Sequence, residues 1–340
     1  MNAANDPLLS VRNLTVHFKR RRSSPFATPA VVHAVDGVSF QVQRGATLAI
    51  VGESGSGKTT TALSIMRLAP ITSGSVTLDG SALTALEGAE LRRMRRHLQI
   101  VFQDPYSSLN PRVRAGAAVR APLDLMGIGT PAEREERVAE LFRSVGLRPE
   151  QRYLFPHQFS GGQRQRINIA RALATKPALV ICDEPVSALD VAVRAQTLNL
   201  LQKLQQDMGL TYLFISHDMA VVEHMCDEIA VMYLGQIVEK ASRQAFFDHP
   251  LHPYSWALMS AVPTLHAERK RVGGRIHLQG DPPNPIDPPP ACRFAPRCPF
   301  AEERCRTEIP PLRPIGLTGR QVACHLVDES GNTPHPRLYG

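Results

Sequence analysis

The stretch of sequence that decides the fold spans residues 52–60 and reads Gly52-Glu53-Ser54-Gly55-Ser56-Gly57-Lys58-Thr59-Thr60. An apolar run of strand length, residues 48–51, leads into it, and a helical pattern follows from Thr60 to Arg67. Strand, glycine-rich loop and helix in this order are typical of a phosphate-binding P-loop. The glycines let backbone N–H groups surround phosphate oxygens, Lys58 adds a positive charge, and the Thr59 hydroxyl can ligate Mg²⁺. A Gly-Ser turn with an incidental lysine is the alternative, and it would not need these flanks.

A second apolar run, residues 179–182, ends in the acidic pair Asp183 and Glu184. Neighbouring side chains on a strand point to opposite faces of the sheet, so the two carboxylates can have different roles. We expect Asp183 to hold Mg²⁺ and Glu184 to orient or deprotonate an attacking water. The alternative is a solvated acidic turn before Pro185, which is less favoured in a chain that also has a P-loop.

A third segment combines a helix start with two glycines, and it reads Phe159-Ser160-Gly161-Gly162-Gln163-Arg164-Gln165-Arg166. Ser160 is a good helix N-cap, and the glycines leave backbone donors open to an approaching anion. A chain with one P-loop does not need a second anion site for its own nucleotide. We therefore expect this segment to cover the γ-phosphate of a nucleotide held by another subunit.

Together these motifs resemble the ATP-binding cassette (ABC) proteins, in which residues 160–163 would be the signature motif, with Phe159 where leucine is more usual. Gln103 resembles the Q-loop glutamine, Asp190 the D-loop aspartate and His217 the switch histidine, all in the family's order. The resemblance implies that Gln103 contacts Mg²⁺ and the lytic water and that His217 hydrogen-bonds the γ-phosphate. It also implies that Asp190 shapes a dimer interface. A loop amide, a histidine at a strand end and a helix cap are the respective alternatives.

The resemblance also implies a fold and a division into domains. We expect an α/β P-loop NTPase of the ABC type, with a RecA-like core, an antiparallel β subdomain and a helical subdomain that carries the signature motif. The cassette would span residues 1–250, and a Pro/Cys-rich C-terminal extension would span residues 251–340. An aromatic residue upstream of the P-loop stacks on adenine in this family. An insert blurs the alignment there and leaves three candidates, Phe18, Phe26 and His33.

Composition and chain organisation exclude several uses of such a cassette. No apolar run approaches the roughly 18 residues that a membrane-spanning helix needs, and the N-terminus lacks a basic and apolar leader. This predicts a cytoplasmic chain, unlike exporters that are fused to membrane helices. The chain has one cassette and no long coiled-coil insertion, which disfavours the translation and DNA-repair types. The basic group at residues 92–96 is expected to form a solvated helix face, and no nucleic acid partner is expected.

Further segments resemble the ATPases of oligopeptide and dipeptide importers, namely residues 102–111, 182–190, 250–254 and the cysteine-rich tail. The resemblance implies that ATP hydrolysis at a cassette dimer interface drives uptake of di- or oligopeptides. The implied partners are a second ABC ATPase subunit, two transmembrane permease subunits and an extracytoplasmic substrate-binding protein. The chain would then be peripheral, at the cytoplasmic face of the inner (plasma) membrane. Nickel or glutathione as cargo, and a soluble ABC ATPase without transport, remain alternatives.

The tail differs from the rest of the chain in composition, because 15 of the 28 prolines follow residue 250. Residues 281–290 predict an extended, polyproline-like connector. Cysteines stand wider apart in this tail than the close pairs that are typical of structural zinc; they are Cys292, Cys298, Cys305 and Cys324. Some members of the importer family carry a [4Fe-4S] cluster in this region, so the resemblance implies one here. Free thiols packed as apolar groups, or a labile zinc site assisted by His325, remain open.

Overall fold

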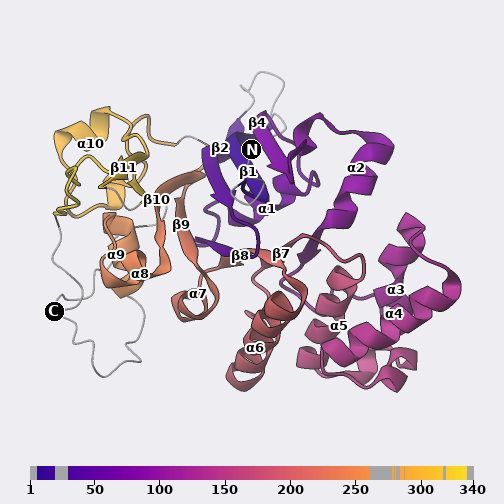
Figure 1. Ribbon diagram of the computed structural model, residues 1–340. Helices are drawn as coiled ribbons and strands as arrows, with labels where there is room; N and C mark the ends of the chain where they lie inside the picture. Colours follow the sequence, from indigo (N-terminus) through magenta and orange to yellow (C-terminus); the bar gives the residue numbers. More distant parts are fainter. Residues whose placement is uncertain are drawn as a thin grey trace. The chain divides into compact units, whose positions relative to one another are not determined.

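The computed structural model describes residues 6–19, 30–260, 278, 280, 284–286, 288–316 and 319–334. These residues form two compact units, which are coloured along the sequence in Figure 1. The first unit includes the described residues of Met1–Ser10, Gln41–Thr47 and Thr77–Ile215, and the second includes those of Val11–Phe40, Leu48–Val76 and Ser216–Gly340. Phe26 lies outside the described residues, as does part of the expected connector at 281–290.

The first unit contains three parallel strands in the order β8-β7-β6. They are β6 (Leu98–Val101), β7 (Leu179–Asp183) and β8 (Thr211–Ser216). Every residue of β7 and β8 is buried. A parallel strand that is covered on both faces requires a continuous apolar sequence. The burial of β7 confirms the buried strand expected before the acidic pair. Ile181 pairs with Ile100 on one side and with Leu213 on the other, so β7 lies between its neighbours.

Helices make up most of the remainder of this unit. They are α2 (Gly88–Met94), α3 (Ala115–Met126), α4 (Pro131–Ser144), α5 (Gly161–Leu173) and α6 (Val191–Met208). Short elements complete the unit: β5 (Ser81–Ala82), η1 (Leu83–Ala85), η2 (Arg95–His97), η3 (Pro149–Tyr153) and η4 (Pro156–Gln158). Helices α3, α4 and α5 contact one another and form the expected helical subdomain (Figure 1). No residue of α2 is buried, which confirms that the basic group at 92–96 lies on a solvated face.

In the second unit, five strands follow one another in the order β11-β12-β10-β9-β3. They are β3 (Thr47–Val51), β9 (Glu228–Tyr233), β10 (Gln236–Ser242), β11 (Arg313–Ile315) and β12 (Arg320–Val322). The pair β3 and β9 is parallel, whereas the other pairs are antiparallel. A second group of neighbouring strands has the order β2-β1-β4 and comprises β1 (Leu9–Lys19), β2 (Val31–Val42) and β4 (Ser73–Leu78).

Helix α1 (Lys58–Ile65) follows the P-loop and differs in its limits from the expected range of 60–67. It begins two residues earlier because Gly57, with φ of 105°, adopts the left-handed conformation of its N-cap. It ends before Arg67 because that residue has φ of 55°, which is incompatible with a right-handed helix. Sequence periodicity finds a helix more reliably than its ends, since single backbone conformations decide where it stops.

The C-terminal part of the second unit contains several short helices. They are α7 (Met219–Met225), α8 (Arg243–Asp248), α9 (Pro253–Ser260), η5 (Ala295–Arg297) and α10 (Glu303–Thr307). Strand β12 pairs with β10, and a small apolar core groups Leu251, Ile315, Val322, Cys324 and Val327. The buried carboxylate of Glu239 on β10 accepts a hydrogen bond from Arg320 at 2.6 Å. This part of the chain therefore has apolar contacts of its own.

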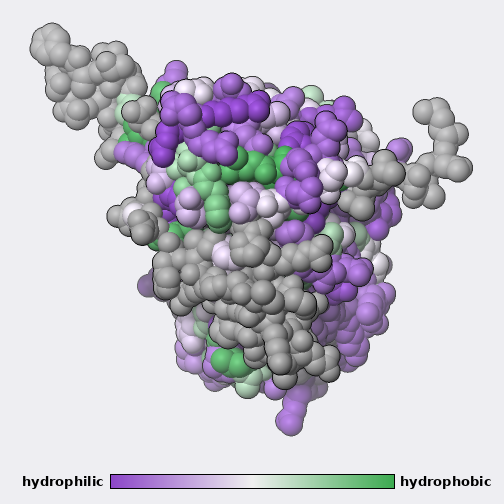
Figure 2. All heavy atoms as spheres, turned by 90° about the vertical axis from the view of Figure 1, so that its left-hand side faces the viewer, coloured by the Kyte–Doolittle hydropathy of each residue, from purple (hydrophilic) through white to green (hydrophobic). Residues whose placement is uncertain are grey.

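Where residues are coloured, the face drawn in Figure 2 is largely hydrophilic, and hydrophobic surface is confined to small patches. Within the described ranges, no helix combines the length and apolar character that crossing a membrane would require.

Candidate nucleotide-binding and catalytic site

The P-loop lies in the second unit, between β3 and α1, and two of its glycines are sterically required. A Cβ atom at Gly52 would lie 2.2 Å from the carbonyl oxygen of Met232, and one at Gly57 would lie 2.3 Å from that of Ala34. Both glycines also have positive φ, of 154° and 105°. Only glycine therefore fits, because the loop is pressed against the backbone of β9 and β2.

Lys58 is the first residue of α1, and its ammonium group lies under the loop. Its Nζ atom donates hydrogen bonds to the carbonyl oxygens of Gly52 at 2.9 Å and Glu53 at 2.8 Å. The side chain is buried, whereas Thr59 is exposed and Thr60 half-buried. Ser54 and Gly55 are exposed at the tip of the loop. A positive charge thus lies among the backbone groups that would face phosphates.

Glu53 is held at both its backbone and its side chain by residues that follow residue 250. Its N–H donates to the Tyr254 hydroxyl at 2.8 Å. Its carboxylate accepts two hydrogen bonds from the Arg297 guanidinium, at 2.8 and 3.2 Å. Neither partner could be predicted from the sequence. Cysteines are the visible pattern around Arg297, and residue spacing gives no signal for a contact across 244 residues.

The acidic pair lies at the end of β7 in the first unit. Asp183 is 5% exposed, and Glu184, directly after it, has a backbone φ of 47°. The Glu184 N–H donates to the Ile215 carbonyl at 3.0 Å, and its Oε2 accepts from Nε2 of Gln103 at 3.1 Å. The structure therefore brings together two of the predicted catalytic residues, Glu184 and Gln103. Strained backbone of this kind is concentrated at functional sites.

The predicted signature motif begins α5, with Ser160 as its N-cap. The Ser160 Oγ accepts from the Gln163 N–H at 3.3 Å, and Gln163 Oε1 accepts from the Ser160 N–H at 3.0 Å. The two side chains thus form a capping box, which gives hydrogen-bond partners to backbone N–H groups that have none within the helix. A Cβ atom at Gly162 would lie 2.4 Å from Val193 Cγ1, so this glycine allows α5 and α6 to approach. A Cβ atom at Gly161 would lie 3.2 Å from the Tyr106 hydroxyl oxygen, so this position is also tight.

The D-loop and switch candidates lie at the starts of two further elements. Asp190 is the N-cap of α6 and accepts from the Val193 N–H at 2.9 Å, so the capping alternative for this residue is confirmed. Val191, the first residue of α6, is 80% exposed. His217 is exposed and follows β8, and Asp218 beside it caps α7.

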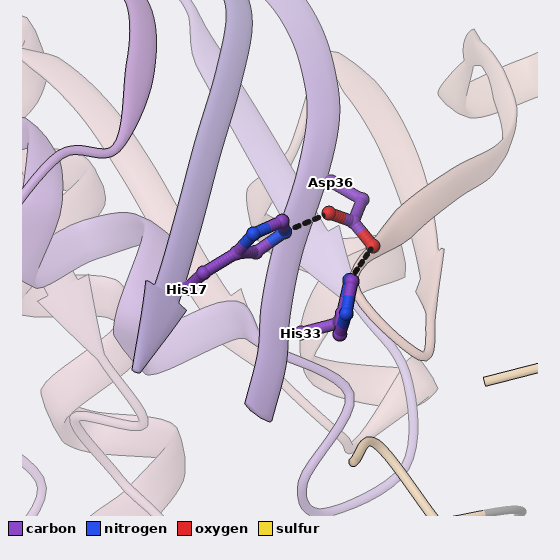
Figure 3. A group of neighbouring side chains, drawn as sticks. All are labelled: His17, His33 and Asp36. Carbon is purple, nitrogen blue, oxygen red and sulfur yellow. Dashed lines mark hydrogen bonds and ion pairs between the residues drawn. The ribbon is translucent and has the colours of Figure 1, made fainter. Parts of the chain in front are cut away.

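Two of the three candidates for adenine stacking are described, and they differ in their surroundings. Phe18 is 37% exposed on β1. The His33 ring instead packs against His17 at 4.2 Å between centroids, and its Nδ1 lies 3.2 Å from Asp36 Oδ2 (Figure 3). Burial alone would raise the pKa of Asp36, but hydrogen bonds from Arg293 and His17 hold it below its usual range. The His33 side chain is therefore in contact with His17 and Asp36, whereas the Phe18 side chain is partly exposed.

The four cysteines of the tail line one small cavity, together with His325 and Phe294. None of them forms a disulfide. Burial raises the pKa of Cys298 to about 11 and that of Cys324 to about 12. In the described part of the chain, no three of the sulfur atoms come within 4.8 Å of one another.

Comparison with known proteins identifies the family. Residues 35–187 match the model of the ABC transporter family, and residues 238–305 match the oligopeptide/dipeptide transporter C-terminal region. A relative in Sinorhizobium fredii, named "Probable peptide ABC transporter ATP-binding protein y4tS", is 50% identical over 95% of this chain and 90% of its own. The di/tripeptide transport ATP-binding protein DppF of Pseudomonas aeruginosa is 45% identical over 95% of this chain and 99% of its own.

Solved structures agree with these relatives. A dimeric post-hydrolysis structure of the ATP-binding cassette MJ0796, bound to ADP and Pi, is 30% identical, with a TM-score of 0.61. It covers 69% of this chain and 98% of its own. The predicted fold class, the family and the ATPase activity are thereby confirmed. The chain belongs to the ABC transporter ATP-binding proteins of the oligopeptide/dipeptide importer family, and it is an ATPase that uses ATP and Mg²⁺.

Proposed function

We propose that this chain hydrolyses ATP to drive the import of di- or oligopeptides through membrane permease partners. The observation that carries the proposal is the similarity to named peptide transporters over 95% of the chain. The match to the oligopeptide/dipeptide C-terminal region supports the same cargo class.

Each predicted site residue has a proposed role. The P-loop backbone and Lys58 bind the β- and γ-phosphates, and Thr59, Asp183 and Gln103 hold Mg²⁺ directly or through water. Glu184 orients or deprotonates the attacking water. Gln103 supports this role, because its amide donates to the Glu184 carboxylate at 3.1 Å and fixes its direction. His217 is the proposed hydrogen-bond partner of the γ-phosphate.

The proposed assembly is a head-to-tail pair of cassettes beneath two permease subunits, with an extracytoplasmic binding protein delivering the cargo. The signature residues 160–163 would cover the nucleotide of the partner cassette. ATP then favours the closed pair because the γ-phosphate bridges both chains, and hydrolysis removes that bridge. The chain would lie peripherally at the cytoplasmic face of the membrane. Phe18 is the proposed adenine-stacking residue, since it is exposed while His33 is held by Asp36.

A [4Fe-4S] cluster is the proposed occupant of the cysteine-lined cavity. All four cysteines line one cavity and none of them forms a disulfide, which suits a cluster with four thiolate ligands. A single zinc ion, with Zn–S bonds of about 2.3 Å, would bring the sulfurs to about 3.8 Å from one another. Within the described residues, no three of these sulfurs lie within 4.8 Å of one another, which supports the larger centre. Its role would be structural, linking four separate positions of the extension.

Nucleotide binding by the Lys58→Ala variant tests the site assignment. Loss of the ammonium beneath the P-loop should weaken ATP binding at least about tenfold, because a charge-assisted contact to phosphate is removed. Titration calorimetry with Mg·ATP measures the change, and Lys203→Ala on α6 serves as the matched control. Equal affinity in Lys58→Ala and Lys203→Ala would remove Lys58 from the site.

A further inference from the structure

The short segment of residues 292–298 in the cysteine-rich extension carries two arginines that both reach the surroundings of the P-loop. Arg297 forms the two-bond pair with the Glu53 carboxylate at 2.8 and 3.2 Å. Its side chain is only 7% exposed, and its guanidinium also lies 6.0 Å from the ring centre of Tyr233. Burial alone would lower the pKa of Arg297, yet the hydrogen bonds to Glu53 and Tyr233 raise it. Planar, paired contacts of this kind are the most directional that arginine makes.

Three buried aromatic rings hold this contact in place. Tyr254 is fully buried, and its hydroxyl accepts the Glu53 N–H at 2.8 Å. Its ring packs on Tyr233 at 4.7 Å and on Phe294 at 5.5 Å between centroids. Phe294 belongs to the same short segment as Arg297 and is 1% exposed. Glu53 is therefore fixed at its backbone and its side chain by groups that cannot easily move.

The fixed glutamate in turn contacts the P-loop lysine. The carbonyl oxygen of Glu53 accepts a hydrogen bond from Lys58 Nζ at 2.8 Å. An unbroken series of contacts thus runs from Arg297 through Glu53 to the lysine that would meet the phosphates. The side chains of Arg297 and Lys58 at the two ends of this series are both buried, whereas that of Glu53 between them is 29% exposed.

The second arginine, Arg293, anchors the strand behind the loop. Its guanidinium donates to Asp36 on β2 and to the Leu234 carbonyl. The Asp36 carboxylate also accepts from His17 and lies 3.2 Å from His33 (Figure 3). Ala34 lies two residues before Asp36 on the same strand. Its carbonyl oxygen would be only 2.3 Å from a Cβ atom at Gly57. The same segment therefore holds the loop at Glu53 and the strand against which Gly57 packs.

We propose that residues 292–298 form a positioning element for the P-loop, in which Arg297 holds Glu53 so that the loop is preorganised for the phosphates of ATP. The inference rests on the proposed assignment of this loop to the ATP phosphates. A loop already fixed in its binding conformation loses less conformational entropy when the nucleotide binds. Arg297 is thus a positioning residue and touches no reacting atom.

The test compares Arg297→Ala with Arg304→Ala. Arg304 is a matched control from the same extension, because it is exposed and paired with Glu308 at 2.9 Å. We expect the Kd for Mg·ATP to rise about tenfold in Arg297→Ala, with kcat at saturating ATP within about twofold of wild type, and no change in Arg304→Ala. Arg297→Lys should recover only part of the affinity, because an ammonium cannot form the paired contact.

A second variant tests the same contact in case Arg297→Ala folds poorly. Glu53→Gln removes the charge from the partner that is 29% exposed and keeps its shape, and it should also raise the Kd. The double variant Arg297→Ala/Glu53→Gln should bind ATP no more weakly than the worse single variant, since both remove one interaction. Additive losses in the double variant would overturn the inference.

Lys58→Ala separates this inference from the proposed function. If Lys58→Ala weakens ATP binding while Arg297→Ala and Glu53→Gln match Arg304→Ala, the positioning role is wrong and the site assignment stands. If Lys58→Ala binds ATP as wild type does, the site assignment itself is wrong and the inference falls with it.

Discussion

Glu184 has a backbone φ of 47°, in the left-handed region that a residue with a side chain adopts at an energetic cost. Its N–H is held by the Ile215 carbonyl, and its carboxylate is held by the Gln103 amide. Sequence analysis predicted both functional residues from their motifs. It did not predict the strained backbone, because the conformation of one residue depends on the packing of β8 beside β7.

The Glu184→Gln variant should bind ATP as tightly as wild type but hydrolyse it at least about a hundredfold more slowly, since the amide cannot accept a proton. Phosphate release under saturating ATP and calorimetric titration measure the two properties. Glu150→Gln, at an exposed position of the same unit, is the control and should be normal in both. Wild-type turnover in Glu184→Gln would contradict the assigned role.

Helices α4 and α5 begin with the same device, a capping box formed by Thr130 with Glu133 and by Ser160 with Gln163. In each box the hydroxyl accepts the N3 amide at 3.3 Å. Such boxes are readable from sequence, because a hydroxyl residue followed three positions later by Glu or Gln is their pattern. What the pattern cannot tell is which box also meets a ligand.

Alanine at the two caps separates these roles. Thr130→Ala and Ser160→Ala should each lower the free energy of unfolding by about 1 kcal/mol, because each leaves a helix-start amide without its partner. Only Ser160→Ala should also reduce ATPase activity, if the signature motif covers a phosphate. Denaturant unfolding and steady-state ATPase assays measure both effects. Equal ATPase rates in the two variants would contradict a ligand role for Ser160.

At the scale of the whole molecule, the parts with local signals were predictable and the contacts between distant segments were not. Buried strands β3 and β7 follow from continuous apolar runs, and the P-loop from its glycines. The pairing of β12 with β10 had no local signal, because three-residue strands carry too little pattern. The Glu53 to Arg297 contact was equally hidden, and the boundary at residue 250 stays a prediction.

The cysteine-lined cavity predicts that the protein binds iron. Protein purified without oxygen should be brown and contain about four irons per chain. Cys298→Ser should lose most of this iron, whereas Cys226→Ser, at a buried cysteine outside the cavity, should retain it. Mass spectrometry of metals measures the iron and zinc content of the wild type and of both variants. Zinc, or no metal, in intact anaerobic protein would remove the cluster.

Peptide uptake by cells that lack this chain is the most direct test of its function as an importer ATPase. Cells that supply the wild-type chain, the Glu184→Gln variant or the Glu150→Gln control would be given a radiolabelled tripeptide, with labelled nickel and glutathione measured in parallel. We predict that wild type and Glu150→Gln restore uptake of the peptide alone, and that Glu184→Gln does not, because transport requires ATP hydrolysis. Peptide uptake that is equal with Glu184→Gln and wild type, or restored uptake of nickel or glutathione in place of peptide, would contradict this function.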